Sequence, residues 1–154
     1  MTVLFVCTGN TCRSPMAADY FRTLCEHENL DHITVKSAGL SGGGRPLNKL
    51  TRRVLLEAGI APAKRTSTKL TDALVEEADL IIAMTRLHKQ SVEQLYSGAH
   101  DKVSTLLSHL GSSADVEDPL GGSFEDYRRC LKTMAPALEA LAAEVSVPEP
   151  PTAR

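Results

Sequence analysis

The chain lacks long hydrophobic runs, and this absence argues against two classes of protein. None of its 154 residues belongs to an apolar stretch close to the roughly 20 residues that a membrane-spanning helix needs. The apolar run at 3–6 is too short for the core of a signal peptide, and no basic residue precedes it. We therefore expect a cytoplasmic protein with no membrane partner.

An excess of charge of one sign is also missing. Lysine and arginine number 17, aspartate and glutamate 19, and the net charge is −2, with the basic residues scattered. Nucleic acids attract proteins with a concentrated basic surface, so no nucleic-acid partner is expected. The length fits one domain, which we place at 1–146 and expect to be a monomer. Residues 147–154 contain three prolines, and we expect a disordered tail.

The four cysteines are too few and too scattered for a disulfide framework or a zinc site. No Cys-x-x-Cys pair occurs, which makes a zinc site a weak hypothesis. We therefore predict neither a metal nor a cofactor. Isolated cysteines are usually buried and inert, and we expect this of Cys25 and Cys130.

Short apolar runs alternate with segments of helical periodicity along the whole chain. Such alternation predicts parallel strands joined by right-handed crossovers. The fold class is therefore α/β, a doubly wound, four-stranded parallel sheet with helices on both faces. The expected strands are 3–6, 33–36, 79–84 and 103–107, and the expected helices are 14–24, 47–58, 71–77, 86–97 and a long one from 123.

The segment from Cys7 to Ser14 lies between the first strand and the first helix. A loop in this place can curl its backbone N–H groups around an anion, and the helix dipole adds positive potential. We expect Gly9 to supply the backbone freedom for the curl, and Ser14 to cap the helix that Pro15 opens. Ligands of such sheets bind at the carboxyl ends of the strands, so the sequence predicts a phosphate-binding loop here.

Two side chains of this loop suggest chemistry. Arg13 can offer its planar guanidinium to two phosphoryl oxygens at once. The same positive surroundings favour the thiolate of Cys7, which is the nucleophilic form of cysteine. The pattern predicts a phosphatase in which Cys7 attacks a phosphoryl group bound by Arg13 and the loop.

Phosphoryl transfer also needs an acid for the leaving group, and Asp118 is the best candidate. Pro119 restricts the backbone of Asp118 to extended conformations, and Gly121-Gly122 keep it in a loop before the last helix. An Asp-Pro pair is also common in turns without any catalytic role.

The chain resembles the low-molecular-weight protein tyrosine phosphatases from Val3 to about Ala143. Four motifs carry the resemblance, and together they are highly specific: Val-Cys-Thr-Gly-Asn-Thr-Cys-Arg-Ser-Pro-Met-Ala from Val6, Ser-Ala-Gly at 37–39, Ala-Asp-Leu-Ile-Ile-Ala-Met at 78–84, and Asp118-Pro119.

The resemblance implies a phosphocysteine intermediate on Cys7, with Asp118 as general acid and then as general base. It implies that Ser14 stabilises the thiolate and that Asn10 and Ser37 hold the loop in shape. Many relatives carry a histidine where this chain has Arg65, which puts that supporting contact in question. The implied substrate-binding residues are Thr8, Gly9, Asn10, Thr11, Cys12, Arg13, Ser14 and Leu120.

Two departures from the tyrosine-specific members concern the substrate, which we expect to be a phosphorylated protein. Those members have isoleucine in place of Thr11, and aromatic residues in place of Leu120 and Gly121 that stack on a phenol ring. Thr11 with Asp-Pro-x-Gly-Gly-Ser resembles the bacterial protein-arginine phosphatases of the family. Thr11 and Asp118 could accept N–H groups of a guanidinium. Our first hypothesis for the substrate is phosphoarginine, and our second is phosphotyrosine. The alternative for Thr11 is that it is an ordinary loop residue with no role in substrate selectivity.

Two more distant functions share parts of this pattern. Thioredoxin-linked arsenate reductases need further cysteines after the third strand, and residues 85–129 contain none. A phosphocysteine carrier needs neither Arg13 nor Asp118. Cys12 could capture an oxidised Cys7 in a disulfide and so make the enzyme redox-regulated, or it could be a small apolar residue beneath the loop.

Overall fold

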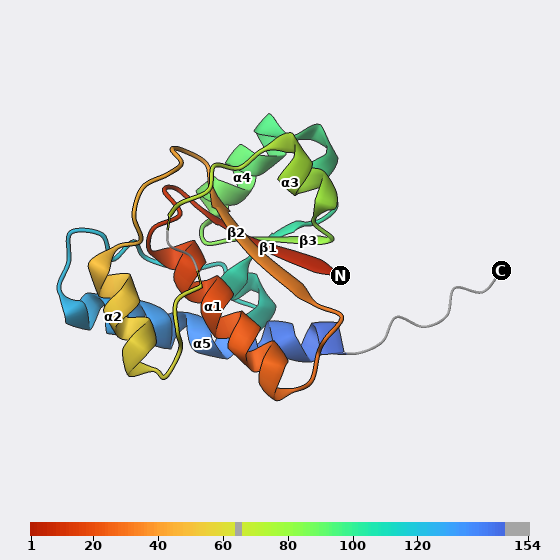
Figure 1. The fold of residues 1–154 in the computed structure, drawn as a ribbon. Coiled ribbons are helices and arrows are strands. Elements are labelled where there is room, and N and C mark those ends of the chain that lie inside the picture. Colours follow the sequence, from red (N-terminus) through yellow and green to blue (C-terminus); the bar gives the residue numbers. More distant parts are fainter. Residues whose placement is uncertain (64–65, 147–154) are drawn as a thin grey trace.

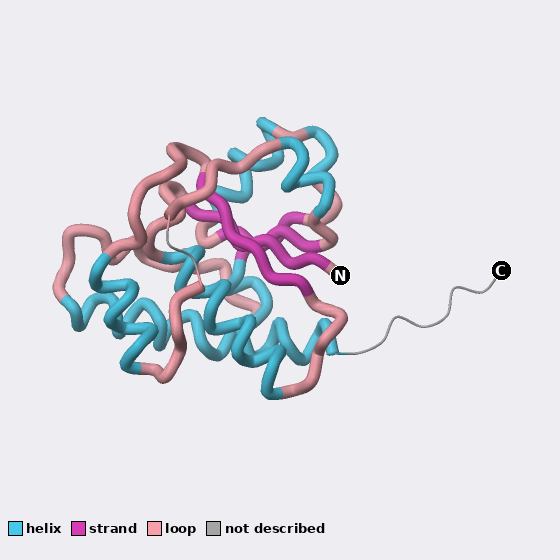
Figure 2. Tube along the Cα trace, in the orientation of Figure 1, coloured by secondary structure: helices cyan, strands magenta, loops and turns pink. Residues whose placement is uncertain are grey.

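Four parallel strands form the central sheet of this structure, a computed structural model that describes residues 1–63 and 66–146. Across the sheet they lie in the order β2 (Thr34–Gly39), β1 (Thr2–Cys7), β3 (Leu80–Ala83) and β4 (Val103–Thr105) (Figure 2). In the register, Cys7 is paired with Gly39, and Val6 with Ala83. The carboxyl ends of the strands therefore meet at one edge, as the predicted α/β class requires.

Helices cover both faces of the sheet (Figure 1). One face carries α1 (Arg13–His27), α2 (Lys49–Glu57) and α5 (Phe124–Ser146). The other carries α3 (Asp72–Glu77) and α4 (Arg86–Leu95). The doubly wound arrangement predicted from the sequence is confirmed.

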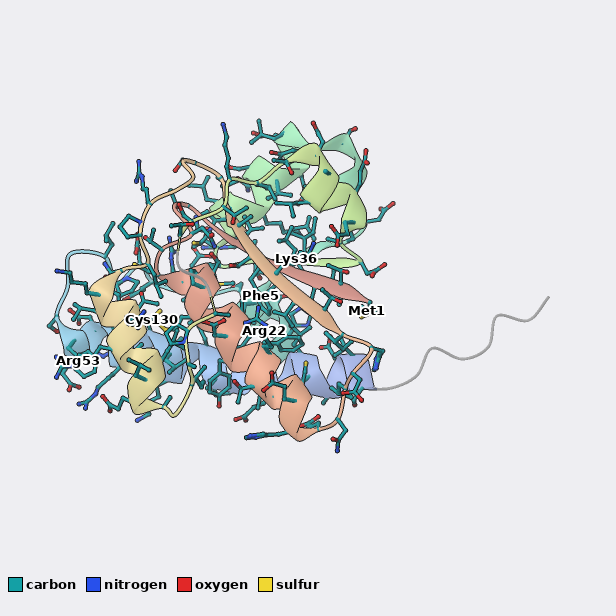
Figure 3. The ribbon with its side chains drawn as sticks, viewed as in Figure 1. Met1, Phe5, Arg22, Lys36, Arg53 and Cys130 are labelled. Carbon is teal, nitrogen blue, oxygen red and sulfur yellow. The ribbon has the colours of Figure 1, made fainter. Side chains whose placement is uncertain are left out.

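The alternation of side chains along β1 divides the core in two. Val3 and Phe5 join the buried cluster under α1 and α5, whereas Leu4 and Val6 join the cluster under α3 and α4. Phe5 lies at the centre of the molecule (Figure 3), and its ring meets that of Phe21 of α1 edge to face at 5.4 Å between centroids. A strand buried on both faces has no polar position, which explains the unbroken apolar run at 3–6.

The fourth strand is shorter than predicted. It ends at Thr105, and a 3₁₀ helix, η2 (Leu106–Leu110), replaces its expected last residues. In a strand, Leu106 and Leu107 would point to opposite faces of the sheet. The helical turn instead places both in the cluster beside α5.

The described helices do not meet the requirements of a membrane span. Within residues 1–63 and 66–146, no helix has both the length and the apolar character required to cross a bilayer. The tail at 147–154 and Arg65 lie outside the described residues, so both expectations for them remain predictions.

Candidate active site

The phosphate-binding loop begins where β1 ends, with Cys7 buried against the start of α1. The helix begins at Arg13, and its N-cap residue is Cys12, without a side-chain hydrogen bond. The prediction that Ser14 caps the helix is therefore wrong. Ser14 lies inside the first turn and is fully buried, where its hydroxyl serves the loop instead.

The hydroxyl of Ser14 lies 2.9 Å from Sγ of Cys7. Its oxygen also accepts a hydrogen bond of 2.8 Å from Nδ2 of Asn10. Because that oxygen already accepts from Asn10, the Ser14 proton is free to donate to the sulfur. Such a donor stabilises a thiolate, so Ser14 fits the role that the resemblance implied.

Asn10 holds the loop to two other segments. Its Nδ2 donates to Oγ of Ser37 at 3.0 Å, and its Oδ1 accepts from the backbone N–H of Thr68 at 2.8 Å. These partners fix which end of the amide faces Ser14. The pairing of Asn10 with Ser37 expected from the resemblance is present in the structure.

Asn10, not Gly9, supplies the unusual backbone of the loop. The φ of Asn10 is 56°, whereas Gly9 is not among the residues with positive φ. The expectation for Gly9 is therefore wrong, because an asparagine can adopt the left-handed conformation when its side chain is bonded locally. The glycine that the loop does require is Gly39, where an added Cβ would lie 2.7 Å from the carbonyl oxygen of Thr8.

The backbone of the loop is arranged to receive an anion. The carbonyl groups of Cys7 and Thr8 accept hydrogen bonds from the N–H groups of Leu40 and Ser41, at 3.0 and 2.9 Å. In contrast, no backbone N–H in 8–13 donates to an acceptor in the described part of the chain. Those donors are available to phosphoryl oxygens, as in other loops at helix N-termini.

Arg13 links this loop to the loop that carries Asp118. Its Nη1 donates to the carbonyl of Val116 at 2.9 Å, and its Nη2 lies 3.5 Å from Oδ2 of Asp118. The Arg13 side chain is 7% exposed and that of Asp118 is 46% exposed. The guanidinium is therefore held in place, while the carboxylate faces solvent.

The Asp118 loop is anchored on the N-terminal side of Asp118. Val116 is fully buried, and its N–H donates to the carbonyl of Met84 at the end of β3. Beyond it, Oδ1 of Asp118 accepts from the N–H of Leu120 at 3.0 Å. Leu120 itself is exposed, and the loop borders a groove of ≈ 460 Å³ that also reaches Cys130.

Thr11 occupies the outer part of the phosphate-binding loop. Its carbonyl accepts from the N–H of Asn48 at 3.3 Å, which ties the loop to the start of α2. Its hydroxyl contacts only Sγ of Cys12, at 3.8 Å, among the described residues. The Thr11 hydroxyl thus has no strong hydrogen-bond partner in the described part of the chain.

The cysteines other than Cys7 differ in their contacts and in the pKa of their thiols. Cys12 lies beneath the loop with its Sγ 3.5 Å from the hydroxyl of Tyr127, and all four cysteines are free thiols. Burial raises the pKa of Cys25 to about 11 and that of Cys130 to about 12, so neither thiol ionises readily. This agrees with the inert role predicted for both.

His88 is the site residue that the sequence reasoning missed. Its Nε2 lies 2.8 Å from Oγ1 of Thr8, although 80 positions separate the two residues. A single histidine inside an amphipathic helix carries no signal by itself. Only the position of α4 after β3, with its first turn at the carboxyl edge of the sheet, could have suggested it.

The predicted site residues therefore converge at one edge of the sheet. Cys7 and Arg13 of one segment come together with Asp118 of another, and the loop residues surround them. No cluster of three or more metal-ligating side chains occurs in residues 1–63 and 66–146.

Comparison with known proteins identifies the family. Residues 2–149 match the low molecular weight phosphotyrosine protein phosphatases. The chain belongs to this family.

Its relatives include two kinds of phosphatase. The chain is 41% identical to a Bacillus subtilis protein named protein-arginine-phosphatase, over 94% of this chain and 97% of that one. It is 33% identical to a low molecular weight protein-tyrosine-phosphatase, PtpB, of Staphylococcus epidermidis, over 84% of this chain and 88% of that one.

A solved structure of an arginine phosphatase has the same fold as this chain. The YwlE arginine phosphatase, in a mutant with a phosphorylated active site serine, superposes with a TM-score of 0.92 at 38% identity, over 97% of this chain and 98% of that one.

Proposed function

We propose that this protein hydrolyses phosphoarginine in proteins through a phosphocysteine intermediate on Cys7. The observation that carries the proposal is the geometry of the phosphate-binding loop. The Cys7 sulfur lies 2.9 Å from the Ser14 hydroxyl and next to backbone donors that have no acceptor in the described part of the chain. A nucleophile and an anion site thus share one loop, as covalent phosphoryl transfer requires.

In the first step, the Cys7 thiolate attacks phosphorus, and the bond from phosphorus to the guanidinium nitrogen breaks. The leaving nitrogen takes a proton from the carboxyl group of Asp118. Arg13 and the N–H groups of 8–13 stabilise the charge on the equatorial oxygens. Arginine leaves, and the phosphoryl group remains on Cys7.

In the second step, water attacks the phosphocysteine. The Asp118 carboxylate removes a proton from the water, the bond between sulfur and phosphorus breaks, and phosphate leaves. The electron pair returns to Cys7 as a thiolate, to which Ser14 donates its proton in a hydrogen bond. The solved relative with a phosphorylated active site serine supports covalent phosphoryl transfer to this loop.

Phosphoarginine is favoured by the mouth of the site. The Thr11 hydroxyl is not bonded to a strong partner in the described chain, and the Asp118 carboxylate is partly exposed. Both oxygens could accept N–H groups of the substrate guanidinium. Leu120 offers an exposed apolar surface without an aromatic ring. The relative with 41% identity carries the corresponding name.

Phosphotyrosine is the second candidate. A relative that is 33% identical over 84% of this chain is named a protein-tyrosine-phosphatase, and the chemical steps would be the same apart from the leaving group. The difference lies in whether the mouth stacks on a phenol or accepts hydrogen bonds from a guanidinium.

The deciding experiment compares the phosphoramidate and the phosphate ester directly. The purified protein is given peptides of one sequence that contain either phosphoarginine or phosphotyrosine, and kcat/KM is measured for both. The proposal expects the phosphoarginine peptide to be preferred by at least about tenfold, the worth of one good hydrogen bond to a charged donor. Preference for the phosphotyrosine peptide would overturn the substrate assignment.

The need for a reduced thiol at Cys7 bears on where the protein acts. We propose that it acts as a monomer in the cytoplasm on phosphorylated proteins, where a reduced thiol at Cys7 can persist. Size-exclusion chromatography with light scattering tests the monomer, and cell fractionation tests the location.

A further inference from the structure

His88 contacts the phosphate-binding loop from the opposite side of the sheet edge. It belongs to the first turn of α4, where its N–H donates to the capping hydroxyl of Thr85 at 3.0 Å. Its ring is buried, with 5% of the residue exposed, and its Nε2 lies 2.8 Å from Oγ1 of Thr8. Thr8 directly follows the nucleophile, and its side chain is exposed.

The surroundings of the ring settle which nitrogen carries the proton. Nδ1 of His88 is buried and has no hydrogen-bond partner among the described residues. A proton on Nδ1 would leave a buried N–H without an acceptor, which is rarer in proteins than an acceptor without a donor. The proton therefore lies on Nε2, which donates to Oγ1 of Thr8.

The ring is neutral at ordinary pH. Burial, and then the positive charge of Arg13, lower the pKa of His88 to about 4, against the opposing influence of Asp118 and Asp115. The imidazole can thus orient Thr8 without adding a positive charge beside Arg13.

The donation from His88 decides the direction of the Thr8 hydroxyl proton. Oγ1 of Thr8 accepts from His88 and has no other described partner, so its own proton is free to donate. Thr8 is the first residue of the segment 8–13, whose backbone N–H groups have no described acceptor, so an O–H donor on it would add to the donors that a phosphoryl oxygen can use.

We propose that His88 is a positioning residue that fixes the Thr8 hydroxyl as a donor to the bound phosphoryl group. The proposal deepens the proposed function and rests on its phosphatase chemistry, but not on the choice of phosphoarginine over phosphotyrosine. His88 would thus contribute to the site from α4, outside the loop motif at 7–14.

The test uses p-nitrophenyl phosphate as substrate and inorganic phosphate as inhibitor. Thr8→Val removes the hydroxyl at nearly constant shape, and Thr8→Ser is the matched control that keeps it. His88→Leu removes the ring donor, and His88→Gln keeps an N–H of similar reach. We expect Thr8→Val and His88→Leu each to raise the Ki of phosphate and the KM by about two- to tenfold, with kcat changed much less.

The double variant separates positioning from packing. If His88 acts through Thr8, the variant with both Thr8→Val and His88→Leu binds phosphate no more weakly than either single variant. His88→Gln should restore most of the affinity. A lower Tm of His88→Leu with an unchanged Ki, or additive losses in the double variant, would overturn the proposal.

Two outcomes distinguish failure of this inference from failure of the proposed phosphatase function. If His88→Leu fails to fold, equal Ki values for Thr8→Val and Thr8→Ser still overturn the inference. If the unmodified protein does not hydrolyse p-nitrophenyl phosphate at all, the proposed phosphatase function fails instead.

Discussion

The phosphate-binding loop at 7–14 and the acid loop at 114–122 meet at Arg13 but are built differently. The first loop is mostly buried, apart from Thr8 at the surface, and is tied to neighbouring segments: Asn10 bonds to Ser37 and to the backbone of Thr68, and the Thr8 carbonyl accepts from Ser41. The second is anchored at the buried Val116, and its carboxylate and apolar tip are exposed.

This difference corresponds to two kinds of task. Stabilising charge on phosphoryl oxygens needs donors that are fixed before the substrate arrives. Transferring a proton to a leaving group and then taking one from water needs a carboxylate that both can reach. The rigid loop therefore suits the chemistry that all substrates share, and the exposed loop suits the part that differs between substrates.

The largest effect is expected at the rigid loop. Cys7→Ser should lower kcat/KM by about 10⁴-fold or more, because a serine hydroxyl is not ionised by this environment and loss of a nucleophile removes most of the catalysis. Binding of inorganic phosphate should persist, since the anion site is mostly backbone. Isothermal titration and initial rates test both points. Activity above about a hundredth of the original would show that Cys7 is not the nucleophile.

The next effect concerns the exposed loop. Asp118→Asn should slow the hydrolysis of alkyl phosphates by about 10²–10⁴-fold, the usual contribution of a general acid. Formation of the phosphocysteine should be affected much less for p-nitrophenyl phosphate, whose leaving group is already a stable anion. Single-turnover rates across a series of leaving groups measure this dependence, and an equal loss for all of them would make Asp118 a binding residue only.

A smaller effect is expected where the two loops face the substrate. Thr11→Ile replaces the hydroxyl with an apolar group at the same branching, so the backbone should be kept. A lost hydrogen bond to a charged donor should lower kcat/KM for phosphoarginine peptides by about ten- to a hundredfold and favour phosphotyrosine. If the ratio of the two kcat/KM values stays within about twofold, a change smaller than one hydrogen bond, Thr11 does not select the substrate.

The smallest effect on basal rate concerns Cys12. We expect hydrogen peroxide to oxidise Cys7 to a sulfenic acid, which the Cys12 thiol would convert to a disulfide with release of water. Dithiothreitol should then restore activity fully. In Cys12→Ser, inactivation should become largely irreversible, since the sulfenic acid is open to further oxidation. Equal recovery in both proteins would mean that Cys12 only packs against Tyr127.

Local and distant features of this site differed in how well the sequence predicted them. Cys7, Arg13 and the strand before them lie within one short segment, so spacing alone predicted that these two residues share one loop. Asp118 lies far along the chain and was found only from Asp-Pro in a loop and from the family resemblance.

The errors arose where tertiary contacts decide local structure. The left-handed conformation fell on Asn10 because three partners hold its amide, and no local rule distinguishes it from Gly9. Ser14 became a partner of the thiol and not a helix cap for a similar reason. His88 was missed because its partner lies 80 positions away.

The division of work between the two loops can be tested in one experiment. Asp118→Asn is mixed rapidly with excess p-nitrophenyl phosphate, and the release of p-nitrophenol is followed from the first milliseconds. The rigid loop should still form the intermediate, while its hydrolysis is slowed for lack of a base. We therefore predict a burst of about one product per active site, with the phosphoryl group found on the Cys7 peptide by mass spectrometry. A linear time course with no adduct on Cys7 would contradict the account.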